Sequence, residues 1–395
     1  MAEMTPRTLS GFMELLPKPQ QQMERMMDIL RRTYSLYGFT PLDTPVIEAA
    51  EVLLAKGGGE TEKQIYRFNK GDADLALRFD LTVPLAKYVA LHYNDLSFPF
   101  RRYQIGKVYR GERAQRGRFR EFYQADIDVI GDGKLDKIGA EKVRTLLIDE
   151  VGVSAESADE ILKFIAITGS NDQVLSALEG YAGRNETFDE GLDQLKTVVK
   201  YLSAFGVPEE NFAVDLTIAR GLDYYTGTVY ETALLDHPEI GSVCSGGRYD
   251  NLAEYYTDKQ LPGVGISIGL TRLFYVLGEQ GMLNGDLPTA PADVLILPMT
   301  EDLSAAVTLA TKLRDAGVRT QLYTEQKKFK AKMNYADKTG VPYVVFLGED
   351  EVKNNVIACK DMTSGEQTTL DFAATLARVR DGLAERNKGK VIVEK

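Results

Sequence analysis

The chain has 395 residues, 44% of them hydrophobic, and a formal net charge of −11 at pH 7. This length exceeds what one core usually needs, so we expect two or more domains, and the apolar content excludes a disordered chain. Cysteine (Cys244, Cys359) and histidine (His92, His237) are too scarce and scattered for a disulfide framework, a zinc cage or a histidine-based triad. The sequence has no run of about 20 apolar residues and no signal pattern, so we expect a cytoplasmic protein with no membrane partner.

The first predicted element is an amphipathic helix over residues 20–37. Met23 and Met26 lie at helical spacing there, and Gly38 follows where a C-terminal cap would fall. A methionine stripe is typical of core or subunit packing, which we prefer to a ligand role. Residues 39–48 contain two prolines and are predicted to be extended, at an edge or interface.

Residues 100–130 are predicted to form two antiparallel strands around a turn. In the second strand, polar residues alternate with aromatic and aliphatic ones. The residues that share its more polar face are Arg118, Arg120, Phe122, Gln124, Asp126 and Asp128. An antiparallel sheet can leave one face open, so we expect this face to hold a charged ligand.

A basic run within this hairpin interrupts an otherwise acidic chain. Against the single acid Glu112, it comprises Arg101, Arg102, Lys107, Arg110, Arg113, Arg116, Arg118 and Arg120. Because arginine matches phosphate with a planar fork, a polyphosphate or a nucleic-acid end is the expected ligand. The alternative is a solvated face neutralised by other domains, but the adjoining polar strand favours a site.

The rest of the chain alternates between helical and extended patterns. Residues 134–204 are helical in pattern, and strands are predicted at 212–217, 228–234 and 263–268, followed by a helix at 270–277. Residues 284–292 are predicted to be a linker because they contain two prolines and a glycine. Beyond the linker, a smaller α/β domain is predicted from strands at 294–297, 319–323 and 343–347 that alternate with helices at 303–316 and 328–338.

Two glycine-containing segments add candidate site residues. Gly263, Gly265 and Gly269 have the wrong spacing for a dinucleotide fingerprint. Small residues instead let a ligand lie close to the strand backbone, with Arg272 directed toward phosphate, although Arg272 taken alone is equally consistent with a surface cation. Residues 219–231, ARGLDYYTGTVYE, place a cation, an anion and two phenols together, which suits a small zwitterion with a polar ring. The alternative for this segment is a turn with packed tyrosines.

These segments resemble a known family. Residues 100–128 and 262–273 are similar to the second and third signature motifs of class II aminoacyl-tRNA synthetases, and residues 37–48 to the weaker first motif. Residues 77–90, 219–231 and 246–252 resemble segments peculiar to histidyl-tRNA synthetases, and residues 327–351 resemble their anticodon-binding domain. The resemblance covers nearly the whole chain.

The resemblance implies a fold, a domain plan and a reaction. The fold would be an α+β catalytic domain, with an antiparallel sheet flanked by helices, plus a C-terminal α/β anticodon-binding domain. Residues 1–130 and 211–283 would form the catalytic core, 131–210 a helical connection or reduced insertion, 284–292 the linker and 293–395 the anticodon-binding domain. A homodimer would join L-histidine to tRNA(His) with ATP and Mg²⁺. Adenylate formation uses the substrate's own carboxylate as nucleophile, so no protein base is needed.

The resemblance also implies the role of individual residues. Arg110, Arg220 and Arg272 would be catalytic, with Arg220 stabilising the α-phosphate and Arg272 meeting the γ-phosphate. The histidine site would comprise Asp80 toward the amino group, Asp128 and Tyr225 toward the imidazole, and Leu81, Thr82, Arg110, Gln124, Arg220 and Tyr224. The ATP site would comprise Arg110, Glu112, Arg118, Phe122 and Arg272. Gln115 and Arg116 would contact tRNA, and no residue is assigned to a metal.

Two features depart from the family pattern. Thr271 stands where many members carry an acid, and the stretch between Asp128 and Arg220 is short, so we expect a reduced insertion. One alternative is a regulatory paralogue such as the non-catalytic subunit of ATP phosphoribosyltransferase, which we expect to lose arginines at positions 110, 220 or 272. A second alternative is a nucleic-acid-binding module, which would not need the tyrosine pair.

Overall fold

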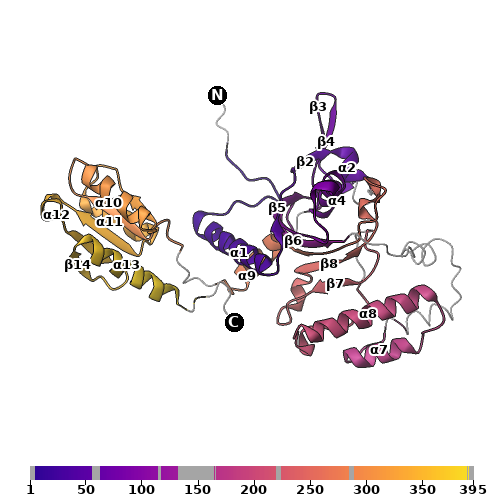
Figure 1. The fold of residues 1–395 in the computed structure, drawn as a ribbon. Helices are drawn as coiled ribbons and strands as arrows, with labels where there is room; N and C mark the ends of the chain where they lie inside the picture. Colours follow the sequence, from indigo (N-terminus) through magenta and orange to yellow (C-terminus); the bar gives the residue numbers. More distant parts are fainter. Residues whose placement is uncertain are drawn as a thin grey trace. The chain divides into compact units, whose positions relative to one another are not determined.

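The structure is a computed structural model of the chain (Figure 1). It describes residues 5–55, 63–113, 117–131, 164, 166–218, 224–283, 289–388 and 390. The chain divides into two compact units, as far as residues are described. The first comprises Met1–Glu14 and Met27–Val276, and the second comprises Leu15–Met26 and Leu277–Lys395.

The first unit is built around a six-stranded sheet with the order β1-β5-β6-β9-β8-β7. The strands are Thr40–Pro41 (β1), Phe100–Tyr109 (β5), Glu121–Ile130 (β6), Val229–Thr232 (β7), Cys244–Tyr249 (β8) and Gly263–Ile268 (β9). β1 is parallel to β5, and every other neighbouring pair is antiparallel. The predicted antiparallel sheet and its long hairpin, β5 with β6, are therefore confirmed.

Smaller elements complete this unit. A three-stranded sheet has the order β2-β4-β3, with bounds Ile47–Ala49 (β2), Arg67–Lys70 (β3) and Ala73–Leu77 (β4). The α-helices of the chain up to residue 283 are Pro17–Leu36 (α1), Ala50–Leu54 (α2), Thr82–Leu91 (α4), Asn171–Glu179 (α7), Glu186–Ala204 (α8) and Leu270–Glu279 (α9). Short 3₁₀ turns lie at Tyr93–Asp95, Glu209–Asn211, Pro238–Ile240 and Leu252–Tyr255. The predicted first helix is confirmed as α1.

The helical stretch is confirmed where it is described, in α7 and α8, which pack side by side (Figure 1). The predicted strand at 212–217 is wrong, because none forms there. The Asn171 side chain, instead of a neighbouring strand, donates to the carbonyl of Phe212 (3.2 Å) and accepts from the amide of Val214 (2.8 Å). The segment then turns at Asp215, whose carboxylate accepts hydrogen bonds from Thr217. An amide side chain thus replaces the ladder of a sheet.

The second unit contains a five-stranded sheet with the order β11-β10-β12-β13-β14. Its strands are Val294–Pro298 (β10), Thr320–Leu322 (β11), Tyr343–Leu347 (β12), Ile357–Asp361 (β13) and Gln367–Leu370 (β14). Its helices are Ser304–Asp315 (α10), Phe329–Thr339 (α11), Glu349–Asn354 (α12) and Phe372–Asn387 (α13). β10 is parallel to β11 and β12 and buried along its whole length, as expected for a parallel strand covered on both faces. The α/β pattern predicted for this region is confirmed.

The core of the first unit lies under the pocket described below. Leu85 and Val89 of α4 pack with Leu252 and Leu261, and the rings of Tyr224 and Tyr249 join the same cluster. Aromatic side chains that line a site are thereby held by the core itself. No helix within the described ranges is long and apolar enough to cross a membrane.

Candidate active site

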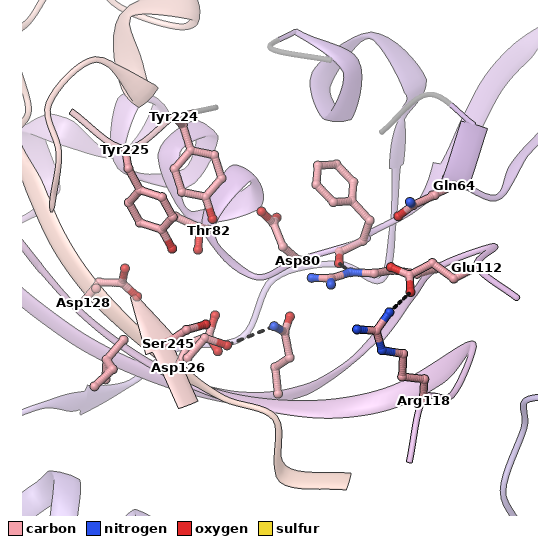
Figure 2. Close-up of a pocket in the computed structure, with 16 residues that line it drawn as sticks. Gln64, Asp80, Thr82, Glu112, Arg118, Asp126, Asp128, Tyr224, Tyr225 and Ser245 are labelled. Carbon is pink, nitrogen blue, oxygen red and sulfur yellow. Dashed lines mark hydrogen bonds and ion pairs between the residues drawn. The ribbon is translucent and has the colours of Figure 1, made fainter. Parts of the chain in front are cut away.

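Two adjoining cavities open on one face of the six-stranded sheet. The first has a volume of about 420 Å³ and is rich in carboxylates and tyrosines (Figure 2). It is lined by Gln64, Phe79, Asp80, Thr82, Arg110, Glu112, Arg118, Gln124, Asp126, Asp128, Tyr224, Tyr225, Ser245, Gly265, Ile266 and Ser267. Figure 2 shows Tyr224, Tyr225 and Asp128 toward one end of this cavity and Glu112 and Arg118 toward the other.

The second cavity, of about 500 Å³, contains the remaining cations and an aromatic ring. Its lining includes Phe122, Glu231 and Arg272. The two cavities share Arg110, Glu112, Arg118, Gln124, Ser245 and Ser267. Two ligands bound in these cavities would therefore meet at the shared residues.

Arg110 lies at this junction and is held from two sides. Its Nε donates to the carbonyl oxygen of Phe79 (3.0 Å), and its guanidinium carbon lies 5.3 Å from the ring centroid of Phe122. Glu112 and Arg118 flank it, with Oε2 and Nη1 4.0 Å apart. A fixed guanidinium at the junction can contact an anionic group of either ligand.

Asp80 is placed at the N-terminal end of α4. Its Oδ1 accepts a hydrogen bond from the amide of Val83 (3.1 Å), whereas its buried Oδ2 has no hydrogen-bond partner among the described residues. Burial raises the pKa of this carboxyl to about 6, against the opposing effects of the Val83 hydrogen bond and of Arg110. Leu81 is also buried but lines neither cavity, and its carbonyl oxygen accepts from Arg102 (3.1 Å).

β6 brings three polar side chains into the first cavity. Gln124 donates from Nε2 to Ser267 Oγ (2.9 Å), while its buried Oε1 has no partner among the described residues. Asp126 and Asp128 are each 2% exposed, and burial raises the pKa of both carboxyls, that of Asp126 to about 7. Because side chains two residues apart lie on one face of a strand, the expected polar face is present at these positions.

Asp128 belongs to a buried cluster that sequence reasoning missed. Its Oδ1 accepts a hydrogen bond from the hydroxyl of Tyr249 (2.5 Å). Its Oδ2 lies 2.7 Å from Arg102 Nη2, in an ion pair outside hydrogen-bond geometry. Arg102 is fully buried, so the expectation that the whole basic run meets phosphate is wrong at this position. Charge counting ignored that alternate residues of β5 point into the core.

The glycines of the sheet serve this packing. A Cβ added to Gly265 would lie 2.1 Å from Asp128 Oδ1, and one added to Gly263 would lie 2.3 Å from the ring of Tyr249. The protein's own side chains therefore occupy the space directly over Gly263 and Gly265, although Gly265 and Ser267 of the same strand also line the first cavity. Tyr225 similarly packs against Gly247, and its ring centroid lies 4.8 Å from that of Tyr224.

The second cavity is closed by the start of α9. Arg272 donates from Nη2 to the carbonyl oxygen of Ile240, and burial lowers its pKa. The hydroxyl oxygen of Thr271 accepts a hydrogen bond from the backbone amide of Tyr123 on β6 (2.8 Å). Thr271, which departs from the family pattern, thereby joins α9 to the central sheet. A threonine at this position stabilises the site without contributing charge.

Most of the expected site residues are brought together. Arg110, Glu112, Arg118, Phe122, Arg272, Asp80, Thr82, Gln124, Asp128, Tyr224 and Tyr225 line one or both cavities. Arg220, Gln115 and Arg116 lie outside the described residues. The cavity residues that sequence reasoning did not assign include Gln64, Asp126, Ser245 and Ser267. Asp126 had a signal in its place on the polar face of β6, and Ser267 had one in its place on the glycine-containing strand.

Comparison with known proteins agrees with this geometry. The family model for histidyl-tRNA synthetase matches residues 11–151 and 140–273, together more than half of the chain, and the model for the anticodon binding domain matches residues 293–381. The histidine--tRNA ligase of Clostridium tetani is 46% identical over 432 residues, covering 95% of this chain and 98% of that protein. That of Xanthomonas axonopodis pv. citri is 44% identical over 456 residues, covering 94% and 95%.

Solved structures give the same result. The crystal structure of histidyl-tRNA synthetase from Nostoc sp. PCC 7120 has a TM-score of 0.82 and 36% identity, covering 96% of this chain and 100% of that one. A Bacillus halodurans structure described as an ATP phosphoribosyltransferase regulatory subunit/histidyl-tRNA synthetase shares the fold, with a TM-score of 0.64 and 22% identity. From its family match, its curated relatives and its fold, this chain belongs to the histidyl-tRNA synthetase family.

Proposed function

We propose that this protein is a histidine--tRNA ligase, which activates L-histidine with ATP and transfers it to the 3′ end of tRNA(His). The observation that carries the proposal is the pair of adjoining cavities, one lined by carboxylates and tyrosines and the other by an aromatic ring and arginines. They meet at Arg110, where the histidine carboxylate and the α-phosphate of ATP would come together. Holding two reactants in this way supplies much of the rate enhancement of such a reaction.

The first cavity would bind histidine. Asp80 would accept the α-ammonium group with the oxygen that has no protein partner among the described residues, and Arg110 would hold the carboxylate. The imidazole would then lie toward Asp128 and Tyr225, with Leu81, Thr82, Gln124 and Tyr224 around the substrate. Leu81 would act through its backbone, because its side chain is buried away from the cavity.

The second cavity would bind ATP. Phe122 would stack on adenine beside Glu112, while Arg118 and Arg272 would contact the phosphates. Arg272 would exchange its hydrogen bond to the Ile240 carbonyl for one to the γ-phosphate. Arg220 would stabilise the charge that develops on the α-phosphate, so the carboxylate can attack without a protein base.

Magnesium would bind with the ATP phosphates rather than in a cage made by the protein. No cluster of three metal-ligating side chains occurs among the described residues. The ATP cavity nevertheless contains two carboxylates, Glu112 and Glu231, which fit an ion that keeps several waters and takes one or two protein ligands. When bound, Mg²⁺ would neutralise phosphate charge.

The second unit would bind tRNA(His), with Gln115 and Arg116 of the first unit reaching the acceptor end. Its family match supports this role, and Lys327, Lys328 and Lys330 are exposed at the start of α11. Lys332 is not part of that basic surface, because it is buried and donates to the carbonyl oxygen of Pro298 (2.5 Å). We expect a chain of residues 1–290 to form adenylate but to charge tRNA poorly. Full charging by that chain would refute the tRNA-binding role.

We also propose the domain limits, the assembly and the location that the resemblance implies. The catalytic core would comprise 1–130 and 211–283, with a reduced insertion at 131–210, a linker at 284–292 and the anticodon-binding domain at 293–395. A homodimer is supported by exposed apolar side chains around the first motif, including Leu36 (85% exposed) and Tyr37 (68%). The cytoplasm, where free histidine and tRNA are present, is the proposed location, and it suits a chain whose two cysteines form no disulfide.

The regulatory alternative is less supported. The curated relatives at 42–46% identity are named ligases, and the structure whose title names a regulatory subunit/histidyl-tRNA synthetase shares only the fold. Arg110 and Arg272, which we expect a paralogue to lose, both line the ATP cavity. The test is aminoacylation of tRNA(His) with radioactive histidine. A ligase charges this tRNA and no other, whereas a regulatory subunit charges none.

A further inference from the structure

Asp126 is a buried carboxylate of the histidine cavity that the proposed function leaves without a role. It lies on β6 opposite Gln104 of β5 and Ser267 of β9, is 2% exposed and lines only the first of the two cavities. Its Oδ1 is buried and makes no hydrogen bond within the described part of the chain. A buried carboxylate oxygen without a donor is costly, so a ligand is expected to supply one.

The other two carboxylates of this cavity differ from Asp126 in their partners. Asp128 has its oxygens against Tyr249 and Arg102, so the protein already positions and neutralises it. Asp80, near Arg110, is directed by α4 and suits the α-ammonium group. Each of the three carboxylates has a buried oxygen without a hydrogen-bond partner among the described residues, but that of Asp128 is paired in charge with Arg102, and that of Asp80 suits the ammonium group. Of these three, Asp126 therefore has the acceptor that is left for the imidazole end of the cavity.

Charge counting leads to the same residue. Arg110 and Asp80 would balance the carboxylate and ammonium groups of histidine. At the other end, two carboxylates, Asp126 and Asp128, face one guanidinium, that of Arg102. Counted over the described residues, this end therefore lacks one positive charge. One bound proton would correct this imbalance, either on the imidazole or on Asp126. These two forms are the same complex, and they differ only in which end of the hydrogen bond holds the proton.

We propose that Asp126 is a specificity-determining residue, whose carboxyl group and the imidazole of bound histidine share one proton through a direct hydrogen bond. This inference rests on the proposed function and adds a residue to its amino-acid site. Asp128 acts beside it by fixing the charge and shape of the pocket through Arg102 and Tyr249. Selection would then favour a ring that is both a donor and a base near pH 7.

The groups around Asp126 make this sharing possible at neutral pH. Burial raises the pKa of Asp126 to about 7, with Asp128 and Asp80 raising it further and Arg102 and Ser267 opposing them. From α1, Tyr34 also feels this charge, and burial keeps its pKa above the ordinary value. An unperturbed imidazole has a pKa of about 6.5. The two partners thus have matched proton affinities, and neither must be forced into its rarer form.

The test uses the full-length enzyme, the variant Asp126→Asn and the control Asp95→Asn, whose carboxylate is 81% exposed. Histidine-dependent ATP–pyrophosphate exchange is measured with L-histidine and with 1,2,4-triazolyl-3-alanine, a similar side chain whose ring is much less basic. Loss of a charge-assisted hydrogen bond should lower kcat/KM for histidine roughly 10- to 100-fold in Asp126→Asn. The preference for histidine over the triazole should fall at least about tenfold, with KM for ATP unchanged.

The pH profile separates this role from a structural one. In the wild-type enzyme and in Asp95→Asn, kcat/KM for histidine should fall about tenfold from pH 7 to 8.5, because binding then requires uptake of a proton. In Asp126→Asn this fall should be absent. If Asp126→Asn lowers kcat/KM equally for histidine and for the triazole, and keeps the wild-type pH dependence, the inference is overturned.

The pH dependence of the wild-type enzyme tests the shared proton without any variant. If kcat/KM for histidine is level or rises between pH 7 and 8.5, Asp126 does not share a proton with the ring, even if Asp126→Asn fails to fold. Absence of histidine-dependent exchange at every pH would instead refute the proposed function. The two failures are therefore distinguishable.

Discussion

Replacement of Arg102 by methionine tests whether the buried ion pair supports the site. Arg102 is fully buried, its Nη2 lies 2.7 Å from Asp128 Oδ2, and methionine keeps much of the side-chain volume without the charge. Removing one partner of a buried pair typically costs about 3–5 kcal/mol. The Asp128 carboxyl can reduce this cost by taking up a proton. For a carboxyl with an unperturbed pKa near 3.9, protonation at pH 7 costs at most about 4 kcal/mol. We therefore expect Arg102→Met to lose about 2–4 kcal/mol at pH 7.

The stability loss in Arg102→Met is expected to depend on pH. Burial raises the pKa of Asp128 in the folded protein, so its folded state binds more protons and stability falls as pH rises above the unfolded pKa. Without Arg102 that pKa rises further, so the fall in stability continues to higher pH. At pH 5 the proton costs only about 1.5 kcal/mol, so the part of the loss that comes from the unpaired Asp128 charge should not exceed that value. The variant is thus expected to be closest to wild type in acid.

The assay is thermal and urea unfolding of the full chain at pH 5 and pH 7. A loss of this size should lower the melting temperature at pH 7 by roughly 5–15 °C. The double variant Arg102→Met/Asp128→Asn should recover at least about 2 kcal/mol, because no buried charge is left unpaired. Arg31→Met is the matched control, since its ion pair with Asp28 is exposed and should be worth less than about 0.5 kcal/mol. Equal losses at both pH values, or no recovery in the double variant, would refute the reasoning.

Three further variants test the remaining geometry. Gly265→Ala would place a Cβ 2.1 Å from Asp128 Oδ1, so it should raise KM for histidine and lower stability by about 1–3 kcal/mol. The control Gly278→Ala, whose Cβ would meet its nearest atom at 3.6 Å, should do neither. Unchanged histidine kinetics in Gly265→Ala would show that Asp128 has freedom to move. Arg110→Lys loses the planar fork at the cavity junction and should lower kcat/KM in pyrophosphate exchange for histidine and for ATP, each by ~10²–10³; an effect on one substrate alone would contradict the shared role. Arg220→Ala should slow single-turnover adenylate formation by ~10²–10³ with a modest change in histidine affinity, and an unchanged rate constant in rapid-quench measurements would remove Arg220 from catalysis.

Local periodicity predicts much of the central hairpin. The period of two places Phe122, Gln124 and Asp128 on one face, because alternation is a property of the strand alone. It does not show that Asp128 is engaged by Tyr249 and Arg102, since that depends on how β8 and β5 pair with their neighbours. Contacts between strands distant in sequence are set by sheet order, which no local pattern encodes.

Three errors have the same physical origin. Counting charge along the chain groups Arg102 with surface cations, although its position on β5 directs it into the core. Residues 212–217 have a strand-like pattern, yet Asn171 takes the hydrogen bonds that a neighbouring strand would need. β8 is not predicted as a strand, because its adjacent glycines, Gly246 and Gly247, have low strand propensity. These glycines leave room for the rings of Tyr230 and Tyr225, which pack against them. In each case a tertiary partner outweighs the local preference.

The most direct test of the account is ATP–pyrophosphate exchange by the full-length chain with each standard amino acid in turn. The cavity lined by Asp80, Gln124, Asp126 and Tyr225 predicts exchange with L-histidine alone, with other amino acids slower by up to about 10⁴-fold, because buried polar groups reject a side chain that leaves them unpaired. Exchange with another amino acid and none with histidine, or no exchange with any, would contradict it.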